Sequence, residues 1–164
     1  MKFDITKVAN AIIYMLDSES RFLNHRKIAL MIFLVDFYHL EQYGVKVFGD
    51  DYVKDPREPK SVMLDNLFQV IIEDDEIDET DDSYFLIGEL MEYLDIDVIH
   101  RGRYKELKFF KRYESFNDEM FSETEFEILE YIIKKYKNET SRKTANSIFR
   151  IDDFRAVDNG DIII

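Results

Sequence analysis

The sequence predicts a mainly α-helical (α+β) fold, a compact helical domain of about five helices with short β-hairpins and a C-terminal strand. Apolar residues recur at helical spacing in five segments, and shorter β-branched or alternating stretches lie between turn-forming residues. Of the 164 residues, 46% are hydrophobic, including 14 Phe and 10 Tyr. This composition is sufficient for one sizeable core. Because no internal repeat or linker interrupts the chain, we expect a single domain over residues 1–164.

Two helices are predicted in the N-terminal quarter. The first spans about Ile5–Asp17, where apolar residues recur at helical spacing. The second begins near Asn24, a good N-cap, and ends at Tyr43, where Gly44 is a typical C-terminal stop. Its stretch IALMIFLVDFYHL is apolar almost all round, which predicts a central, buried helix.

The connector QYGVKVFGDDYVKDPREPKSVML, residues 42–64, is elaborate for a helical protein. VKVF (45–48) predicts a short strand, Gly49-Asp50 a tight hairpin turn and YVK (52–54) the returning strand. Prolines at 56 and 59 exclude helix up to Ser61, where the third helix is expected to start. A metal loop, a substrate loop and a rigid bracket that shapes a protein-binding surface are three interpretations of this connector, and we favour the bracket.

The second half begins with a solvated acidic loop at 73–83, whose role the sequence does not determine. Alternation in IDVIH (96–100) and KELKFF (105–110), joined at Arg101-Gly102, predicts an antiparallel hairpin, whereas 84–98 gives no clear pattern before it. Ser122 and Glu125 form a capping-box motif at the start of the helix 121–138. A similar start signal at Ser141 predicts a short last helix. The segment NGDIII (159–164) predicts a turn followed by a terminal strand, and the hairpin is a candidate partner for this strand.

The net charge of −13 is concentrated in residues 50–98, which contain 17 acidic and 3 basic side chains. Phosphate contacts dominate nucleic-acid affinity, so we expect no nucleic-acid partner, and the basic segment 100–112 is interpreted as a solvated or protein-contacting face. No signal peptide is evident, and no apolar run approaches the ~18 residues that a membrane span needs. We therefore expect a cytoplasmic protein without a membrane partner.

No arrangement of residues indicates catalysis, a metal or another cofactor. The acidic loop lacks the glycine at position 6 that an EF-hand requires, and the chain has no cysteine. The three histidines, at 25, 39 and 100, have no helical metal-site spacing, and no G-x-S-x-G or phosphate-loop motif is present. We therefore expect a protein that is not an enzyme, and a small hydrolase or nucleotide-binding enzyme is the least favoured class.

Asp36 interrupts the apolar second helix. A buried carboxylate costs several kcal/mol unless it is hydrogen-bonded. It is either a structural acid, bonded to backbone or to Tyr or Lys groups of the following connector, or part of a polar pocket. We favour the structural role.

Several of these features together resemble the SocA-like antitoxin, or Panacea, family. The features are LMIFLVD (30–36), Gly44 eight residues after Asp36, Asp51 in the acidic segment, Pro59 before the third helix, FSETEFEILEYIIKKY (121–136) and the terminal G-x-x-I. The chain departs from the family pattern at Leu30, where the family has lysine, and at Glu58, where it has glycine. Residues 73–98 have no counterpart in the match.

The resemblance implies a non-enzymatic protein that neutralises a small toxin, encoded nearby, by direct binding or by delivering the toxin to a protease. The acidic surface would favour a basic toxin through electrostatic steering. The alternative is a phage- or mobile-element-encoded interaction protein that acts on a host factor. We expect the connector to present Tyr43, Phe48 and Tyr52 to the partner, with binding residues Asp36, Tyr43, Phe48, Asp51, Tyr52 and Pro59.

Overall fold

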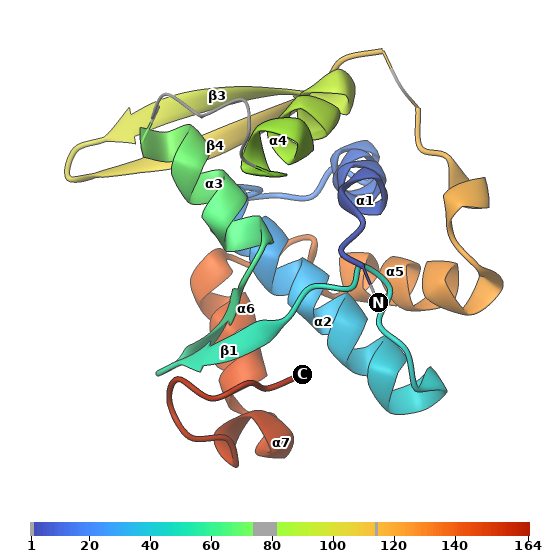
Figure 1. The fold of residues 1–164 in the computed structure, drawn as a ribbon, viewed down its shortest axis with the longest axis vertical. Helices are drawn as coiled ribbons and strands as arrows, with labels where there is room; N and C mark the ends of the chain where they lie inside the picture. Colours follow the sequence, from blue (N-terminus) through green and yellow to red (C-terminus); the bar gives the residue numbers. More distant parts are fainter. Residues whose placement is uncertain (1, 74–81, 114) are drawn as a thin grey trace.

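The computed structural model describes residues 2–73, 82–113 and 115–164 (Figure 1). Within these ranges the chain forms seven α-helices, one short 3₁₀ helix (η1) and two small antiparallel hairpins. In chain order the elements are α1 (Ile5–Asp17), α2 (His25–Tyr43), β1 (Tyr52–Asp55), β2 (Glu58–Ser61), α3 (Leu64–Glu73), α4 (Asp82–Tyr93), β3 (Leu94–Arg101), β4 (Tyr104–Lys111), η1 (Asp118–Met120), α5 (Glu123–Tyr136), α6 (Ser141–Phe149) and α7 (Asp152–Arg155). None of the helices in these ranges is long and apolar enough to cross a bilayer.

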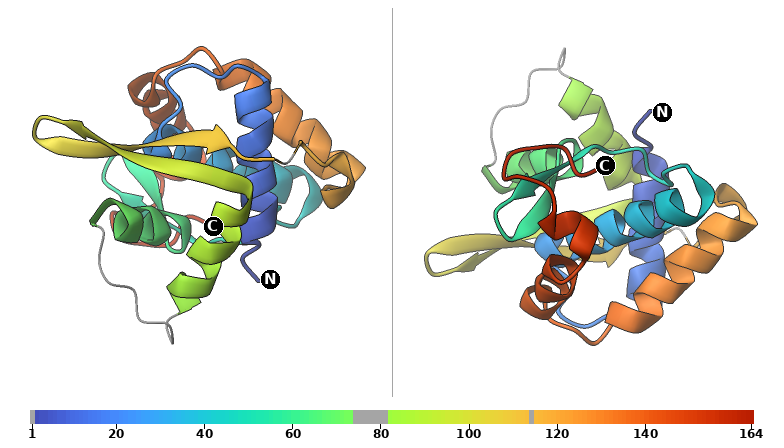
Figure 2. Two further views of the ribbon diagram at one scale, coloured as in Figure 1. Left: turned by 90° about the horizontal axis from the view of Figure 1, so that it is seen from above. Right: turned by 90° about the horizontal axis from the view of Figure 1, so that it is seen from below.

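Helix α2 is the centre of the fold, as the sequence predicts. Residues 27–37 are all buried, and α5 and α6 pack against this helix. Figures 1 and 2 show α2 crossing the middle of the molecule, with α1 and the β3–β4 hairpin on one side and α6 and α7 on the other. The Asn24 side chain caps its first turn, and Gly44 ends it in the left-handed conformation with φ 80°.

The first hairpin differs from the predicted one. Strand β1 pairs with β2 across a turn at Pro56-Arg57, whereas residues 45–48 form no strand. The predicted strand is wrong because the amide groups of Val47 and Phe48 are bound by a buried carboxylate and are therefore not available to a ladder. Helix α3 begins at Leu64 rather than at Ser61, because Ser61 is the last residue of β2.

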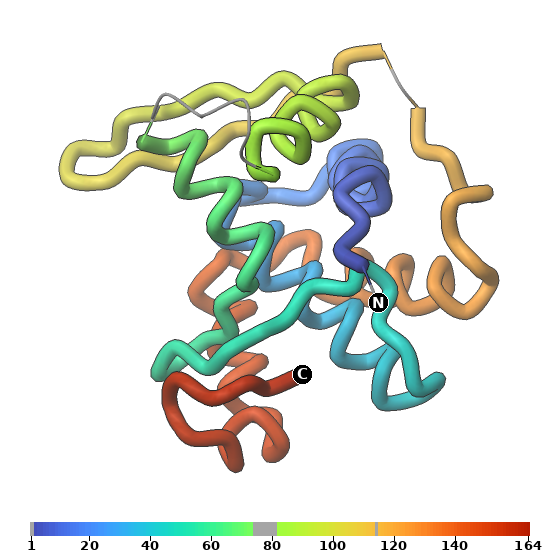
Figure 3. Tube along the Cα trace, in the orientation of Figure 1, coloured from blue at the N-terminus to red at the C-terminus, as the bar shows by residue number. Residues whose placement is uncertain are grey.

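The C-terminal segment covers the other edge of β1. Tyr52 and Lys54 exchange four backbone hydrogen bonds of 2.7–3.1 Å with residues 160–164, and Val53 forms an antiparallel bridge with Ile162. Figure 3 shows the end of the chain alongside this hairpin. The terminal segment thus pairs with β1 and not with the β3–β4 hairpin, its candidate partner from the sequence.

The remaining predictions for the second half hold in most details. Strands β3 and β4 pair over eight residues each around Gly102, and both hydrogen bonds of the Ser122 capping box start α5. Helix α6 begins at Ser141, although Thr140 is its cap. Helices α4 and α7 were not predicted, and residues 74–81 of the acidic loop lie outside the described residues.

Candidate functional site

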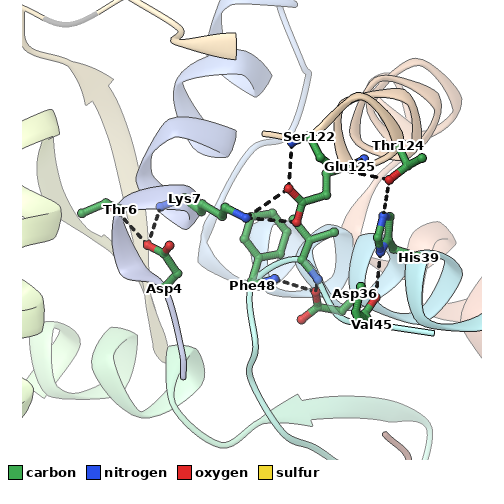
Figure 4. A network of polar contacts seen from close by, with 11 residues as sticks. Asp4, Thr6, Lys7, Asp36, His39, Val45, Phe48, Ser122, Thr124 and Glu125 are labelled. Carbon is green, nitrogen blue, oxygen red and sulfur yellow. Dashed lines mark hydrogen bonds and ion pairs between the residues drawn. The ribbon is translucent and has the colours of Figure 1, made fainter. Parts of the chain in front are cut away.

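Asp36 organises the connector between α2 and β1. One carboxylate oxygen accepts the backbone N–H groups of Val47 at 2.6 Å and Phe48 at 2.8 Å (Figure 4). The other accepts the Tyr52 hydroxyl at 2.7 Å. The side chain is fully buried. Burial raises the pKa of Asp36 to about 6, and the three donors act in the opposite direction. The structural interpretation of Asp36 is therefore confirmed.

A second group of contacts ties the connector to the start of α5. His39 Nδ1 donates to the carbonyl of Val45 at 2.7 Å, and its Nε2 lies 2.9 Å from the Thr124 hydroxyl. Figure 4 shows His39 between the connector and α5. These contacts satisfy the polar groups of an otherwise buried histidine.

Helix α1 joins the same network through its first turn. Lys7 Nζ lies 3.0 and 3.1 Å from the two carboxylate oxygens of Glu125, which also accepts the backbone N–H of Ser122 (Figure 4). The Asp4 amide donates to the carbonyl of Phe48 at 2.9 Å. The connector is thus held by contacts with α1, α2 and α5 together.

The six expected binding residues divide between core and surface. Phe48 and Tyr52 are fully buried, Phe48 against Phe121 and Tyr52 against Phe33, so the expectation that they present aromatic surface is wrong. Asp36 is buried with them. Tyr43 is 44% exposed, and Asp51 is exposed beside Lys46 at 3.3 Å. Pro59 is buried in β2, although it is among the residues that line a groove.

This groove, called the α2–α3 groove below, lies between the first half of α2, strand β2 and helix α3. It is open and has a volume of about 650 Å³. An ion pair of 2.9 Å between Arg26 and Glu58 joins α2 to β2 at its side. The groove is lined by His25, Arg26, Ala29, Leu30, Val53, Asp55, Glu58, Pro59, Lys60, Ser61, Val62, Asp65, Asn66, Phe68 and Gln69.

Two acids fix the wall of the groove where β2 leads into α3. Asp50 accepts the backbone N–H groups of Met63 and Leu64 at 2.9 and 3.0 Å and thereby caps α3. Asp65 accepts the N–H of Ser61 at 2.7 Å, and burial raises its pKa to about 6. Burial also raises the pKa of Asp50. These carboxylates hold backbone, so the groove has a rigid shape.

His25 and Lys27 support the opposite wall. His25 Nδ1 accepts the backbone N–H of Leu107 at 3.1 Å, and burial lowers its pKa, which favours the neutral ring. Lys27 is fully buried, and its Nζ donates to the carbonyls of Arg21 at 2.6 Å and Lys137 at 3.1 Å. Burial lowers the pKa of Lys27 to about 8.

Sequence reasoning missed these supporting residues because their partners are distant in the chain. Only Asp65, an acid in the first turn of a helix, carried a local signal. Among the residues that the structure describes, no three His, Asp or Glu side chains are placed to hold a metal ion. The arrangement suits the binding of a ligand on a fixed surface.

These features define a mainly helical domain with a rigid connector and an open surface groove. The family model for the antitoxin SocA-like, Panacea domain matches residues 30–148. This range is more than half of the chain and contains the connector, β1, β2 and α3, so the chain belongs to the SocA-like antitoxin (Panacea) family. No curated protein and no solved structure matches the chain.

Proposed function

We propose that this protein is a cytoplasmic antitoxin that neutralises a small basic toxin by direct, stoichiometric binding. The observation that carries the proposal is the family match over residues 30–148. The net charge of −13 supports a basic partner, because opposite charge accelerates encounter and suppresses wrong partners.

The α2–α3 groove is the docking surface that we propose for the toxin. Its position supports this choice, because it lies inside the family match and Pro59 lines it. Ala29, Leu30 and Phe68 are buried beneath it, whereas Val62 and charged groups of β2 are accessible beside it, so the accessible surface combines apolar and charged groups, as at many protein interfaces. Tyr43 and Asp51, both exposed, are additional candidates for contact.

A growth assay tests the function. Each open reading frame adjacent to the gene is induced alone and together with this protein. We expect one neighbour to arrest growth and co-expression to restore it, with recovery of a stable complex and an unchanged toxin level. A toxin level that falls with this protein, and recovers in protease-deficient cells, would replace direct neutralisation by delivery to a protease. If no neighbour is toxic, the antitoxin proposal fails, and a pull-down from host lysate tests the host-factor alternative.

A matched pair of variants tests the groove. Val62 lies in the α2–α3 groove with 48% of its surface exposed, and Tyr131 lies on α5 with 52% exposed. Val62→Arg places a long cation in the groove and should weaken binding of the toxin by about tenfold or more, since an interface tolerates poorly a bulky residue at its centre. Tyr131→Arg should bind as the wild type does. Equal binding by both folded variants would exclude the groove as the docking surface.

A further inference from the structure

Among the described residues, no strand pairs with the outer edge of β3. Strands β3 and β4 are joined by the two-residue turn Gly102-Arg103, so the pair Arg101↔Tyr104 next to the turn is a hydrogen-bonded pair. Along an antiparallel ladder every second pair is hydrogen-bonded, and Ile96, Val98 and His100 belong to the pairs that are not. The bond from the Arg112 amide to the Tyr93 carbonyl continues this ladder at 3.2 Å. The backbone groups of Ile96, Val98 and His100 therefore point away from β4.

The other strand edges in the described part of the chain have features that limit pairing with a further strand. Residues 160–164 cover the edge of β1. On β2, Pro59 has no N–H, and the N–H of Ser61 is bound by Asp65. On β4, the N–H of Leu107 is bound by His25. Within the described residues, by contrast, no hydrogen bond reaches the backbone N–H and C=O groups of Ile96, Val98 and His100.

A hollow of about 580 Å³ lies along the first half of this edge. Four successive β3 residues, Leu94 to Asp97, line it together with Met91, Phe110 and Arg112. Asp95, Asp97 and Phe110 lie on the exposed face of the hairpin, whereas Leu94 and Ile96 point to the other face, so the hollow opens on the exposed face and reaches β3.

The two faces of β3 differ in chemistry. Leu94, Ile96 and Val98 point toward the core, where Leu94 is buried and the other two are half-buried. Asp95 and Asp97 lie on the opposite, exposed face, where β4 already places a cation on one side of each: Arg112 forms an ion pair of 3.5 Å with Asp95, and Lys108 is the cross-strand partner of Asp97. A strand beside β3 would place its residues directly next to these. Apolar side chains would therefore suit its inner face and cations its outer face.

We propose that the β3 edge takes up an extended segment of a partner protein, with basic and apolar residues alternating, as a third strand of the hairpin. The added backbone would pair with Ile96, Val98 and His100, a mode of recognition in which main-chain bonds provide affinity and alternate side chains provide specificity. The proposal adds a second contact to the protein-binding function proposed above. Its test with a synthetic peptide does not depend on whether the partner is a toxin.

The test uses an end-capped peptide of alternating lysine and valine with the same length as β3, eight residues. The full-length protein is labelled with ¹⁵N and titrated with this peptide, and with an alternating glutamate–valine peptide as a charge control. We expect the Lys–Val peptide to shift the amide signals of Ile96, Val98 and His100 most strongly, and the Glu–Val peptide to leave them in place. Shifts confined to other surfaces, or equal binding of both peptides, would overturn the proposal.

Two proline variants separate this edge from the opposite one. His100 and Lys105 are cross-strand partners with exposed side chains, and their N–H groups point to opposite edges of the hairpin. His100→Pro removes a donor from the β3 edge and should weaken peptide binding by about fivefold or more, whereas Lys105→Pro should change it by less than about twofold. A larger loss for Lys105→Pro, with both variants folded, would assign the peptide to β4.

A charge reversal provides an independent measurement. Asp97 and Asp153 are both exposed, but Asp153 lies on α7, across the molecule from β3 (Figure 1). Asp97→Lys should weaken binding of the Lys–Val peptide by about fivefold, because it turns an attractive cross-strand pair into a repulsive one, and Asp153→Lys should not. If instead the protein alone forms a dimer that His100→Pro abolishes, the edge belongs to a second copy and the partner proposal is overturned. Peptide binding without any toxic neighbour would contradict only the antitoxin function.

Discussion

Asp36 shows how one side chain determines the path of a long connector. It is a carboxylate in the buried central helix α2, and the acceptors it provides satisfy two backbone amides and a tyrosine hydroxyl that would otherwise be buried without partners. Leaving such groups unsatisfied costs about 1–3 kcal/mol each. The residues at 45–48 therefore curve around this acid and do not form a strand.

The raised pKa of Asp36 leads to a prediction for Asp36→Asn. An ordinary Asp has a pKa of 3.8, but the folded state binds this proton up to about pH 6. The contribution of Asp36 to the free energy of unfolding is therefore greatest below about pH 4. It falls as the pH rises from about 4 to about 6 and is constant at higher pH. Since Asn does not titrate, the unfolding free energy of the wild type minus that of Asp36→Asn should fall by about 3 kcal/mol between about pH 3.5 and about pH 7.

Urea unfolding at intermediate pH values measures this difference. Asp153→Asn, at an exposed position on α7, is the control and should follow the wild type. A difference between wild type and Asp36→Asn that does not change with pH, or that rises with it, would contradict the assignment.

Among the secondary-structure elements, the strand edges differ most in how they are protected. The hairpin β1–β2 has four residues in each strand, too few to be stable alone, and residues 160–164 extend it along β1. An exposed strand edge is a template for pairing with another chain. The C-terminal segment thus has two roles, to add hydrogen bonds and to cover an edge.

Deletion of residues 160–164 should remove both roles. Four backbone hydrogen bonds to Tyr52 and Lys54 disappear, at about 1 kcal/mol each, so the free energy of unfolding should fall by about 4 kcal/mol. The uncovered β1 edge should also promote self-association. Chemical unfolding and light scattering after size-exclusion chromatography measure the two effects. Ile162→Ala, which trims a side chain that is 66% exposed and keeps the backbone, is the control. An equally stable, monomeric truncated chain would show that the segment is dispensable.

For the whole molecule, the distribution of charge matters more than any single ion pair. Acidic residues are concentrated in the middle of the chain, which forms β1, β2, α3, α4 and most of β3. Both proposed binding surfaces, the α2–α3 groove and the β3 edge, are formed in part by these elements. The net charge of −13 gives the whole molecule a field that attracts a basic partner, although the β3 edge also adjoins the basic segment 100–112.

This field should be visible in the kinetics of association with the toxin identified by the growth assay. Between about 0.02 M and about 0.3 M salt the association rate constant should fall by about tenfold, because ions screen long-range attraction. The dissociation rate constant should change much less, since it depends on short-range contacts. Stopped-flow measurements over this range test the expectation. An association rate independent of salt would show that the acidic surface does not steer the partner.

Features that depend on residues close together in the chain can be predicted from the amino-acid sequence alone. The capping box of Ser122 and Glu125, the stop at Gly44 and the turn at Gly102 each follow from residues within a few positions, so the start of α5, the end of α2 and the β3–β4 hairpin agree with the structure, whereas the start of α3 does not. The apolar pattern also identified α2 as the central helix, and the isolated charge of Asp36 indicated that it needs partners.

The positions of the groups that bind Asp36 depend on the tertiary structure. VKVF has the composition of a strand, yet the backbone N–H groups of Val47 and Phe48 donate to the side chain of Asp36. Asp36 lies eleven positions before Val47 and twelve before Phe48 in the chain. Phe48 and Tyr52 are aromatic residues of the kind found in protein interfaces, but both are buried in the core. There Tyr52 packs against Phe33, and Phe48 packs against Phe121. The edge of β1 is covered by residues more than a hundred positions later. Local propensity acts over a few residues, whereas burial and hydrogen-bond satisfaction depend on segments that become neighbours only when the whole chain has folded.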